Sequence, residues 1–277
     1  MRVIETSAEM VAFAGAAPVV LVPTMGALHR GHATLVREAR ELAGEGGTVV
    51  VSIFVNPTQF APGEDFDQYP RDLEADRKTC AEAGADLIFA PPVGEMYSAD
   101  ASIEVRESRL SQVLCGASRP THFAGVCTVV AKLFNLVRPD IAVFGKKDYQ
   151  QLAIIRRLVR DLNFGVQIHG VETVREEDGL AMSSRNLYLS EAERAQAPAI
   201  RRALLKSDMG RRASYIVAEI KRQIRKCAPD GKIDYIELVD AETLERIKGV
   251  VDRPALLAAA VFFGNTRLID NLEVSPE

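Results

Sequence analysis

Two histidines three residues apart, His29 and His32, are the side chains in this sequence best suited to chemistry on an anion. They follow the apolar run Val19–Val22, and glycines at positions 26 and 31 flank the first of them. A helix that starts after a strand offers free N–H groups and a favourable dipole to a phosphate, and glycine lets the backbone approach a ligand closely. The spacing therefore predicts a phosphate-binding loop on which both imidazoles converge.

This loop differs from the common nucleotide-binding loops. No Gly-Lys-Ser/Thr follows it, and its glycines lack the G-x-G-x-x-G spacing. The pair His29 and His32 could also be read as zinc ligands, but a third ligand and the glutamate typical of zinc proteases are missing. An anion site is the preferred interpretation.

A second polar string, Met182–Arg185, follows the turn Glu176–Gly179. Its two serine hydroxyls and one guanidinium can hold a triphosphate, with the arginine binding two oxygens at once. Serine pairs more often cap helices or line loops, so this string alone is a weak signal.

Strand and helix patterns alternate through the first two-thirds of the chain. Apolar residues recur at helical spacing from His32 to Leu42, and glycines follow. Further helices are expected over residues 72–83, 126–137 and 149–162, and strands over 48–54, 86–89, 141–144 and 166–171. Repeated strand–helix–strand units predict an α/β fold with a doubly wound parallel sheet.

The pattern changes after residue 187. Ser190 and Glu193 form a capping box, and the basic segment 194–226 is expected to form two helices around Gly210. Strands are expected over 233–239, 255–263 and 266–270, with a hairpin turn at Gly264-Asn265. We therefore predict two domains, 1–186 and a smaller α+β domain, 187–277.

Composition limits the function classes. The chain has 277 residues with 47% hydrophobic and 26% charged residues, which is typical of globular proteins. Its net charge of −4 argues against nucleic acid as a partner. The longest near-apolar stretch, 254–264, is shorter than the ~20 residues that span a bilayer, and Glu5 and Glu9 are unlike a signal peptide. We expect a cytoplasmic protein without a membrane partner, and its four cysteines form no C-x-x-C pair.

Taken together, the two polar strings are similar to the paired signature of the nucleotidylyl-transferase superfamily. Within it, the sequence closely resembles the pantoate–β-alanine ligase (pantothenate synthetase) family from about Val19 to Asn271. The matching blocks are residues 22–32, 52–60, 69–71, 116–125, 132–137, 139–140, 144–148, 178–186 and 268–271.

The resemblance implies a Rossmann-like first domain, a C-terminal lid domain and a homodimer. It implies a two-step reaction: ATP and pantoate give pantoyl adenylate and pyrophosphate, with Mg2+, and β-alanine then displaces AMP to form pantothenate. By this resemblance, the catalytic residues are His29, His32, Lys147 and Arg185, and His32 is the proton donor.

The resemblance also assigns binding residues. Pantoate would be held by Gln59 and Gln151, whose amides donate and accept at once, and Asp76 is a possible magnesium ligand. ATP would be bound by Met25, Gly26, Ala27, Leu28, His29, Arg30, Gly31, His32, Gly145, Lys146, Lys147, Asp148, Val174, Met182, Ser183, Ser184 and Arg185. Lys146 stands where many relatives have an acidic residue.

Three other functions remain open at this point. A nucleotidyltransferase acting on a phosphorylated substrate would share both histidines but would need a basic pocket in place of Gln59 and Gln151. The basic segment 194–226 could bind RNA, although solvated helix faces are the commoner use of such segments. A nucleotide sensor would bind ATP without releasing pyrophosphate.

Overall fold

The computed structural model describes residues 1–64 and 66–275, which form two compact units. The first unit contains residues 1–112, 116–146 and 151–172, and the second contains 113–115, 147–150 and 173–277. Two short segments from the first half of the chain thus belong to the second unit. The domain boundary near residue 186 stays a prediction.

The first unit is built on a six-stranded sheet with helices, as the α/β prediction requires. Its strands are β1 (Arg2–Ile4), β2 (Val19–Thr24), β3 (Thr48–Ile53), β4 (Leu87–Phe89), β5 (Ile141–Gly145) and β6 (Gln167–Val171). Its helices are α1 (Ser7–Ala12), α2 (Arg30–Ala43), η1 (Pro57–Gln59), α3 (Leu73–Ala83), α4 (Val93–Met96), η2 (Leu110–Gln112) and α6 (His122–Val137). Three helices include residues of both units: α5 (Leu114–Ser118), η3 (Lys146–Asp148) and α7 (Tyr149–Asp161).

The strand order is β1-β4-β3-β2-β5-β6, and all neighbours pair in parallel. The chain runs outward from β2 through β3 to β4 and then returns to β5 on the other side of β2. Ligands in such sheets bind beyond the carboxyl ends of the strands where the direction reverses. The fold therefore places this switch point at the ends of β2 and β5.

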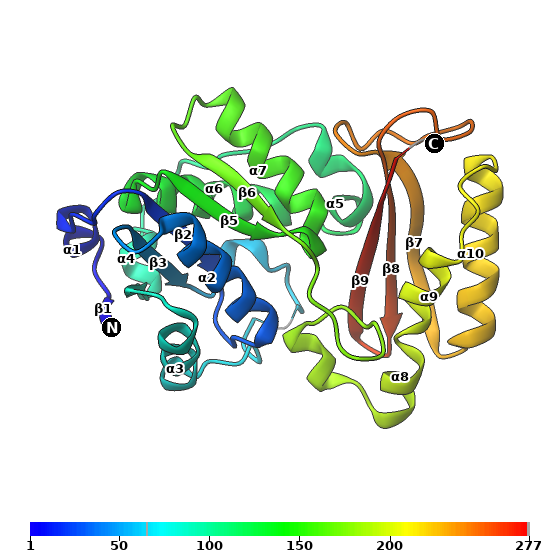
Figure 1. Ribbon diagram of the computed structural model, residues 1–277, viewed down its shortest axis with the longest axis horizontal. Coiled ribbons are helices and arrows are strands. Elements are labelled where there is room, and N and C mark those ends of the chain that lie inside the picture. The colour runs from blue at the N-terminus through cyan, green and yellow to red at the C-terminus, as the bar shows by residue number, and fades with distance from the viewer. Residues whose placement is uncertain (65, 276–277) are drawn as a thin grey trace. The chain divides into compact units, whose positions relative to one another are not determined.

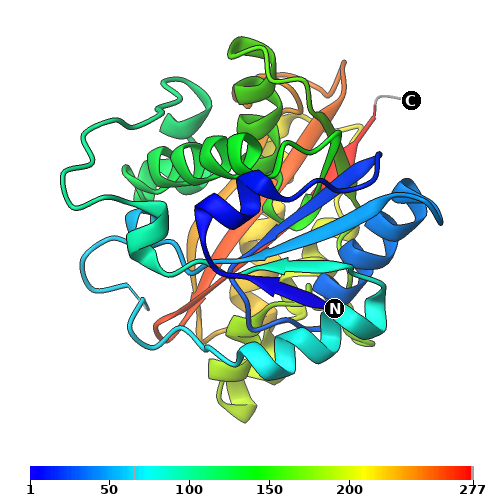
Figure 2. The ribbon, with the colours of Figure 1, turned by 90° about the vertical axis from the view of Figure 1, so that its left-hand side faces the viewer.

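Helices cover both faces of the sheet, with α7 above and α3 below it in Figure 1. On one face, Val36 of α2 and Cys80 of α3 pack against Val20, Val49 and Val51. The opposite face is covered at α7, because a β-carbon on Gly170 of β6 would lie 3.0 Å from Leu152. The strands fan out with the usual twist (Figure 2). Burial on both faces explains their nearly continuous apolar sequence.

Strand β2 continues through Pro23, where the apolar run was expected to end. Pro23 lies opposite Ser52 of β3, whereas pairing with β5 involves only Val20 and Leu21. Proline has no N–H to donate, so it is tolerated in a central strand only where one neighbour is no longer paired.

The second unit contains an antiparallel three-stranded sheet, ordered β7-β8-β9. Its elements are η4 (Ser184–Tyr188), α8 (Glu191–Gln196), α9 (Ala199–Leu205), α10 (Ala213–Cys227), β7 (Gly231–Asp240), β8 (Ala255–Phe263) and β9 (Thr266–Val274). The register pairs Phe263 with Thr266, which confirms the two-residue hairpin at Gly264-Asn265.

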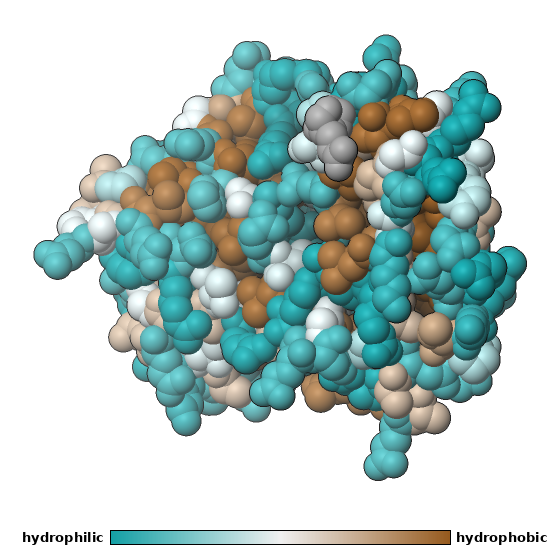
Figure 3. All heavy atoms as spheres, turned by 45° about the vertical axis from the view of Figure 1, so that its right-hand side comes forward, coloured by the Kyte–Doolittle hydropathy of each residue, from teal (hydrophilic) through white to brown (hydrophobic). Residues whose placement is uncertain are grey.

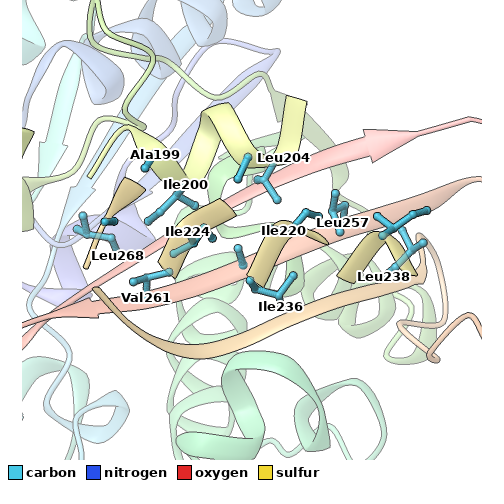
Figure 4. Packing of buried hydrophobic residues seen from close by; sticks show 14 of the residues in the cluster. Ala199, Ile200, Leu204, Ile220, Ile224, Ile236, Leu238, Leu257, Val261 and Leu268 are labelled. Carbon is cyan, nitrogen blue, oxygen red and sulfur yellow. The ribbon is translucent and has the colours of Figure 1, made fainter. Parts of the chain in front are cut away.

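Isoleucines and leucines from α9 and α10 pack on this sheet and form a separate core (Figure 4). Ile220 and Ile224 of α10 and Leu257 of β8 are fully buried there. The helices above them differ from the two expected. The segment before Gly210 is divided into α8 and α9, because Pro198 stands at the N-cap of α9 and cannot continue a helix.

The face shown in Figure 3 is mostly hydrophilic, with hydrophobic residues scattered among polar ones. None of the helices in the described part of the chain has the length and apolar composition needed to cross a membrane.

Candidate active site

The two histidines of the predicted phosphate site lie at the end of the loop between β2 and α2 and in the first turn of α2. His29 is the N-cap of α2, and its Nδ1 accepts a hydrogen bond from the N–H of Gly31 at 3.1 Å. His32 reciprocates, because its Nδ1 accepts from the N–H of His29 at 3.3 Å. Two histidines thus form the capping box usually made by Ser or Thr with Glu or Gln.

This capping box fixes the tautomer of both rings. Since each Nδ1 accepts a hydrogen bond, the ring proton of each neutral imidazole is on Nε2. The ring centroids of His29 and His32 are 4.1 Å apart with an interplanar angle of 33°. Two N–H donors therefore lie side by side at the start of α2, where the helix dipole already favours an anion.

The backbone ahead of the histidines has an unusual conformation. Gly26 has φ +82° and Ala27 has φ +51°, so two consecutive residues occupy the left-handed region. Asp76 of α3 accepts hydrogen bonds from the N–H groups of Ala27, at 3.0 Å to Oδ2, and of Leu28, at 2.7 Å to Oδ1. Asp76 is only 3% exposed. Burial raises the pKa of its carboxyl, and the two N–H bonds oppose that rise.

Asp76 was expected to contact magnesium, and that role stays a prediction. Residues 1–64 and 66–275 contain no group of three or more His, Cys, Asp or Glu side chains that could hold a metal ion. Mg2+ is commonly bound through one or two carboxylates together with substrate phosphates. The donor set therefore fits an ion that comes with a nucleotide and does not fit a cage made by the protein.

Gln59, expected to bind pantoate, has its side chain in a buried hydrogen-bond network. Its Oε1 accepts from Nδ2 of Asn56 at 3.2 Å, and its Nε2 donates to Sδ of Met25 at 2.9 Å. The amide nitrogen of Gln59 is therefore directed to the histidine-bearing loop, and Met25 joins the two predicted binding segments. Asn56 is 1% exposed, and Gln59 is 8% exposed.

Hydrogen bonds at both Oδ1 and Nδ2 fix the orientation of the Asn56 side chain. Its Oδ1 accepts from the hydroxyl of Tyr97 at 2.9 Å and from the N–H and hydroxyl of Thr58, at 3.3 and 2.9 Å. Its Nδ2 also donates to the carbonyl of Gly125 at 3.1 Å. Sequence reasoning did not identify Tyr97, because 41 residues separate it from Asn56 and no local pattern marks it. Burial raises the pKa of the Tyr97 hydroxyl, which keeps it protonated as a donor.

The backbone of Gln59 is held as well. His122 Nδ1 lies 2.9 Å from the carbonyl oxygen of Gln59, and Arg119 donates to the same oxygen at 3.3 Å. Arg119 also forms a bidentate ion pair with Glu64, at 2.5 and 2.7 Å. Burial would raise the pKa of Glu64, but the Arg119 guanidinium outweighs it and lowers that pKa. A β-carbon on Gly125 would lie 2.6 Å from Thr58, so only glycine allows α6 to approach η1 this closely.

The second unit carries the other predicted phosphate residues. Nζ of Lys147 lies 3.6 Å from the Asp148 carboxylate. The N–H of Met182 donates to the carbonyl of Val174 at 3.0 Å, which brings the predicted adenine contact beside the Met-Ser-Ser-Arg string. Ser183 is the N-cap of η4 and accepts from the N–H of Arg185 at 3.3 Å.

Strand β9 holds two of these segments in place, a function that the sequence did not reveal. Asn271 donates from Nδ2 to the carbonyl of Lys147 at 2.9 Å. Asp270, which is 4% exposed, forms a bidentate ion pair with Arg175 at 2.8 and 2.9 Å. Arg175 also donates to the carbonyl of Gly179 at 3.1 Å, so the turn before the Met-Ser-Ser-Arg string is tied to β9.

Three predicted residues lie in the first unit around the ends of β5 and β6. Lys146 forms an ion pair with Glu172 at 2.5 Å. Gly145 is open on its side-chain face, where a β-carbon would meet only Leu35 at 3.9 Å. Gln151 is half-buried in the first turns of α7.

Comparison with known proteins identifies the family. The pantoate–β-alanine ligase family model matches residues 2–273. A pantothenate synthetase of Akkermansia muciniphila is 56% identical over 259 residues, covering 92% of each chain. One from Thermotoga petrophila is 50% identical and covers 98% of this chain and 99% of the relative.

Solved structures agree. The pantothenate synthetase of Thermus thermophilus superposes with a TM-score of 0.93 at 49% identity, over 100% of both chains. The pantoate–β-alanine ligase of Francisella tularensis, in complex with β-γ ATP and β-alanine, has a TM-score of 0.80 at 31% identity, over 98% of this chain and 97% of that one. By sequence and by structure, this chain belongs to the pantoate–β-alanine ligase family, and it is a ligase.

Proposed function

We propose that this ligase condenses pantoate with β-alanine through a pantoyl-adenylate intermediate. In the first step a carboxylate oxygen of pantoate attacks the α-phosphorus of ATP, and pyrophosphate leaves with the bonding electrons. In the second step the amine nitrogen of β-alanine attacks the activated carbonyl carbon, AMP leaves, and the amine loses a proton. Pantothenate, AMP and pyrophosphate are the products.

The observation that carries this proposal is the pair of stacked histidines at the start of α2, each of which accepts a backbone N–H at Nδ1, so that Nε2–H is the donor of the neutral ring. Fixed donors aimed at developing negative charge stabilise a transition state without reorganising. His29 and His32 are therefore assigned to the phosphates, and the Nε2–H of His32 donates a hydrogen bond to the departing pyrophosphate, whose developing charge it stabilises. Lys147 and Arg185 supply further positive charge.

The remaining assignments follow the same logic. Residues 25–32 and 145–148 bind ATP together with Val174 and Met182–Arg185. One N–H of the Gln59 amide donates to Sδ of Met25, and we assign its second N–H to an oxygen of pantoate. Gln151 provides a second amide.

No protein nucleophile is needed, because the substrate carboxylate itself attacks phosphorus. Catalysis then consists of positioning and charge neutralisation. Magnesium belongs to the proposal as the ion bound to the ATP phosphates, where it neutralises charge. A homodimer located in the cytoplasm completes the proposal.

Isotope exchange tests the order of events. With pantoate and Mg2+ present and β-alanine absent, labelled pyrophosphate is expected to exchange into ATP. Adding β-alanine is then expected to release AMP and amide product in equal amounts. If exchange requires β-alanine from the start, the adenylate intermediate is wrong and a concerted reaction replaces it.

The same assay separates the competing functions. A nucleotidyltransferase acting on a phosphorylated substrate would exchange without pantoate. A nucleotide sensor would show no exchange under any condition. Replacing Gln59 or Gln151 by Ala is expected to weaken pantoate binding by ~1–3 kcal/mol each, since hydroxyl and carboxylate oxygens lose a partner, and to leave ATP binding unchanged.

A further inference from the structure

Asp76 lies outside the loop 25–32 in sequence, yet it is the side chain that accepts hydrogen bonds from the N–H groups of Ala27 and Leu28. No backbone carbonyl of the described chain accepts from either N–H. Without the carboxylate these two donors would lie unpaired in a half-buried loop. A charged acceptor roughly doubles the strength of such bonds.

The loop conformation itself depends on this carboxylate. Ala27 has φ +51°, in the left-handed region that non-glycine residues seldom occupy, at a cost of ~1–3 kcal/mol unless the surroundings enforce it. At Gly26, φ is +82°, and a β-carbon there would lie 2.8 Å from Oδ2 of Asp76. The glycine, the strained alanine and the buried carboxylate therefore form one interlocking arrangement.

We propose that Asp76 is a positioning residue, which holds the loop 25–28 in the strained conformation that sets His29 and His32 for the phosphates. The inference rests on the proposed function, because it concerns how the ATP site is shaped. The positioning role differs from that of a metal ligand, because both carboxylate oxygens of Asp76 accept hydrogen bonds from the protein backbone. The carboxylate acts on ATP through the loop and has no direct contact with the nucleotide in this role.

Asp76→Asn tests the proposal with little change in shape. The amide has one acceptor oxygen, and its NH2 group would face one of the two N–H donors. A displacement of about 1 Å in a catalytic group can cost ~10² in rate, so we expect kcat/KM for ATP to fall about 10²-fold. The KM for pantoate is expected to stay within about twofold, since Gln59 is held by the separate Asn56 network.

Glu74→Gln is the matched control. Glu74 lies in the first turn of the same helix, and its side chain is 83% exposed. Its substitution removes the same charge and is expected to leave kcat and both KM values unchanged.

Three results would overturn the proposal. One is an unchanged kcat/KM for ATP in Asp76→Asn, which would show that the loop does not need the carboxylate. Another is a defect that excess Mg2+ restores, which would make Asp76 a metal ligand. The third is a lower melting temperature with normal kinetics below it, which would leave Asp76 only a structural role.

A measurement on the unaltered protein covers the case in which Asp76→Asn does not fold. The N–H groups of Ala27 and Leu28 are expected to exchange slowly with deuterium in the absence of ATP, although no backbone acceptor protects them. Fast exchange at both positions contradicts the proposal. This measurement does not depend on the reaction, so failure of the proposed function and failure of the positioning role can be told apart.

Discussion

His29 caps a helix, and the proposed function gives the same ring a second task in binding phosphate. Nδ1 caps α2 by accepting from Gly31, and this bond leaves the proton of the neutral ring on Nε2. In the proposed function the same ring binds the phosphates, so the proposal couples helix stability to anion binding at a single residue. A substitution that keeps only the cap separates the two tasks.

Asn is such a substitution, because it is among the best N-cap residues. We expect His29→Asn to unfold at nearly the same temperature as the original protein, with turnover reduced by ~10²–10³ through loss of one charge-stabilising donor. His29→Ala is expected to lose the same activity and also ~0.5–2 kcal/mol of stability. Calorimetry and turnover on both variants check this, and normal turnover in His29→Asn would remove the residue from the mechanism.

Tyr97 is connected through Asn56 to Gln59, the residue that we propose to bind pantoate. Its hydroxyl is one of three donors to Oδ1 of Asn56, and Asn56 in turn orients Gln59. In Tyr97→Phe the ring remains beside Phe54, with ring centroids 6.2 Å apart in the parent protein, and only the hydroxyl is lost.

One neutral hydrogen bond is worth ~0.5–1.5 kcal/mol, so Tyr97→Phe is expected to raise the KM for pantoate by about two- to tenfold. The KM for ATP is expected to stay constant, and Asn56→Ala is expected to have the larger effect on pantoate. Titrating each substrate separately is the measurement. An effect on ATP alone would place the Tyr97–Asn56–Gln59 chain in the wrong part of the site.

At the scale of elements, two adjacent side chains of β9 hold neighbouring segments in place. Asn271 holds the carbonyl of Lys147, and Asp270 holds Arg175 in the turn after β6. A strand at the end of the chain thus fixes the backbone of two predicted ATP-binding segments. Its register with β8 is set by the tight hairpin at Gly264-Asn265.

Asn271→Ala removes the donor and leaves the Lys147 carbonyl without it, at a cost of ~1–3 kcal/mol. We expect kcat to fall about tenfold, because Lys147 is no longer held in position. Glu273→Gln on the same strand, at an exposed position, is the control and is expected to behave like the parent protein. If both variants keep full kcat, β9 supports the fold and not the chemistry.

The elements also show what a sequence can and cannot predict. Strands β3 and β5 and helices α2 and α3 were expected within a few residues of their observed bounds, because apolar periodicity and flanking glycines are local signals. Helix α6 begins at His122, four residues before the first residue expected, and the three-residue strand β1 was not expected at all. A strand as short as β1 forms by pairing with the distant strand β4, so its own sequence carries little information about its structure.

Site residues also divide into those that a local pattern predicts and those that only tertiary contacts bring together. The histidine loop could be predicted from spacing, since its glycines and its helix start lie within ten residues. The hydrogen bonds from the N–H groups of the loop to Asp76, and from the hydroxyl of Tyr97 to Asn56, connect residues 41 to 49 positions apart. Tertiary packing creates these contacts, and no pattern along the chain encodes them.

At the scale of the whole molecule, each of the two units has buried hydrophobic residues of its own, and the chain alternates between the units. Valines of the parallel sheet form a core in the first unit, and isoleucines of α10 pack with β8 in the second. The second unit includes residues 113–115 and 147–150. Gln150 joins these two segments, because it accepts from the N–H of Cys115 at 2.9 Å and donates to the carbonyl of Val113 at 2.7 Å.

The second unit is therefore not a segment that can be cut from the chain intact. A fragment of residues 173–277 would lack the Lys147 carbonyl that Asn271 binds and the Cys115 thiol that lies 3.4 Å from Arg267. Arg267 would keep its ion pair with Asp234 at 2.8 Å, and the core around Ile220 would remain. We expect the fragment to fold into its hairpin-and-helix core with lower stability than the same residues have in the intact chain.

Hydrogen exchange of the β8 and β9 amides in both forms is the measurement. The amides of the central strand β8 exchange through the largest unfolding events, so their protection reports the stability of the whole unit. Unpaired buried groups cost ~1–3 kcal/mol each, which predicts exchange that is about ten- to a hundredfold faster in the fragment. Equal protection would show that residues 173–277 form an autonomous domain. The segments 113–115 and 147–150, and the hydrogen bond from Asn271 to Lys147, would then contribute nothing to the stability of that domain.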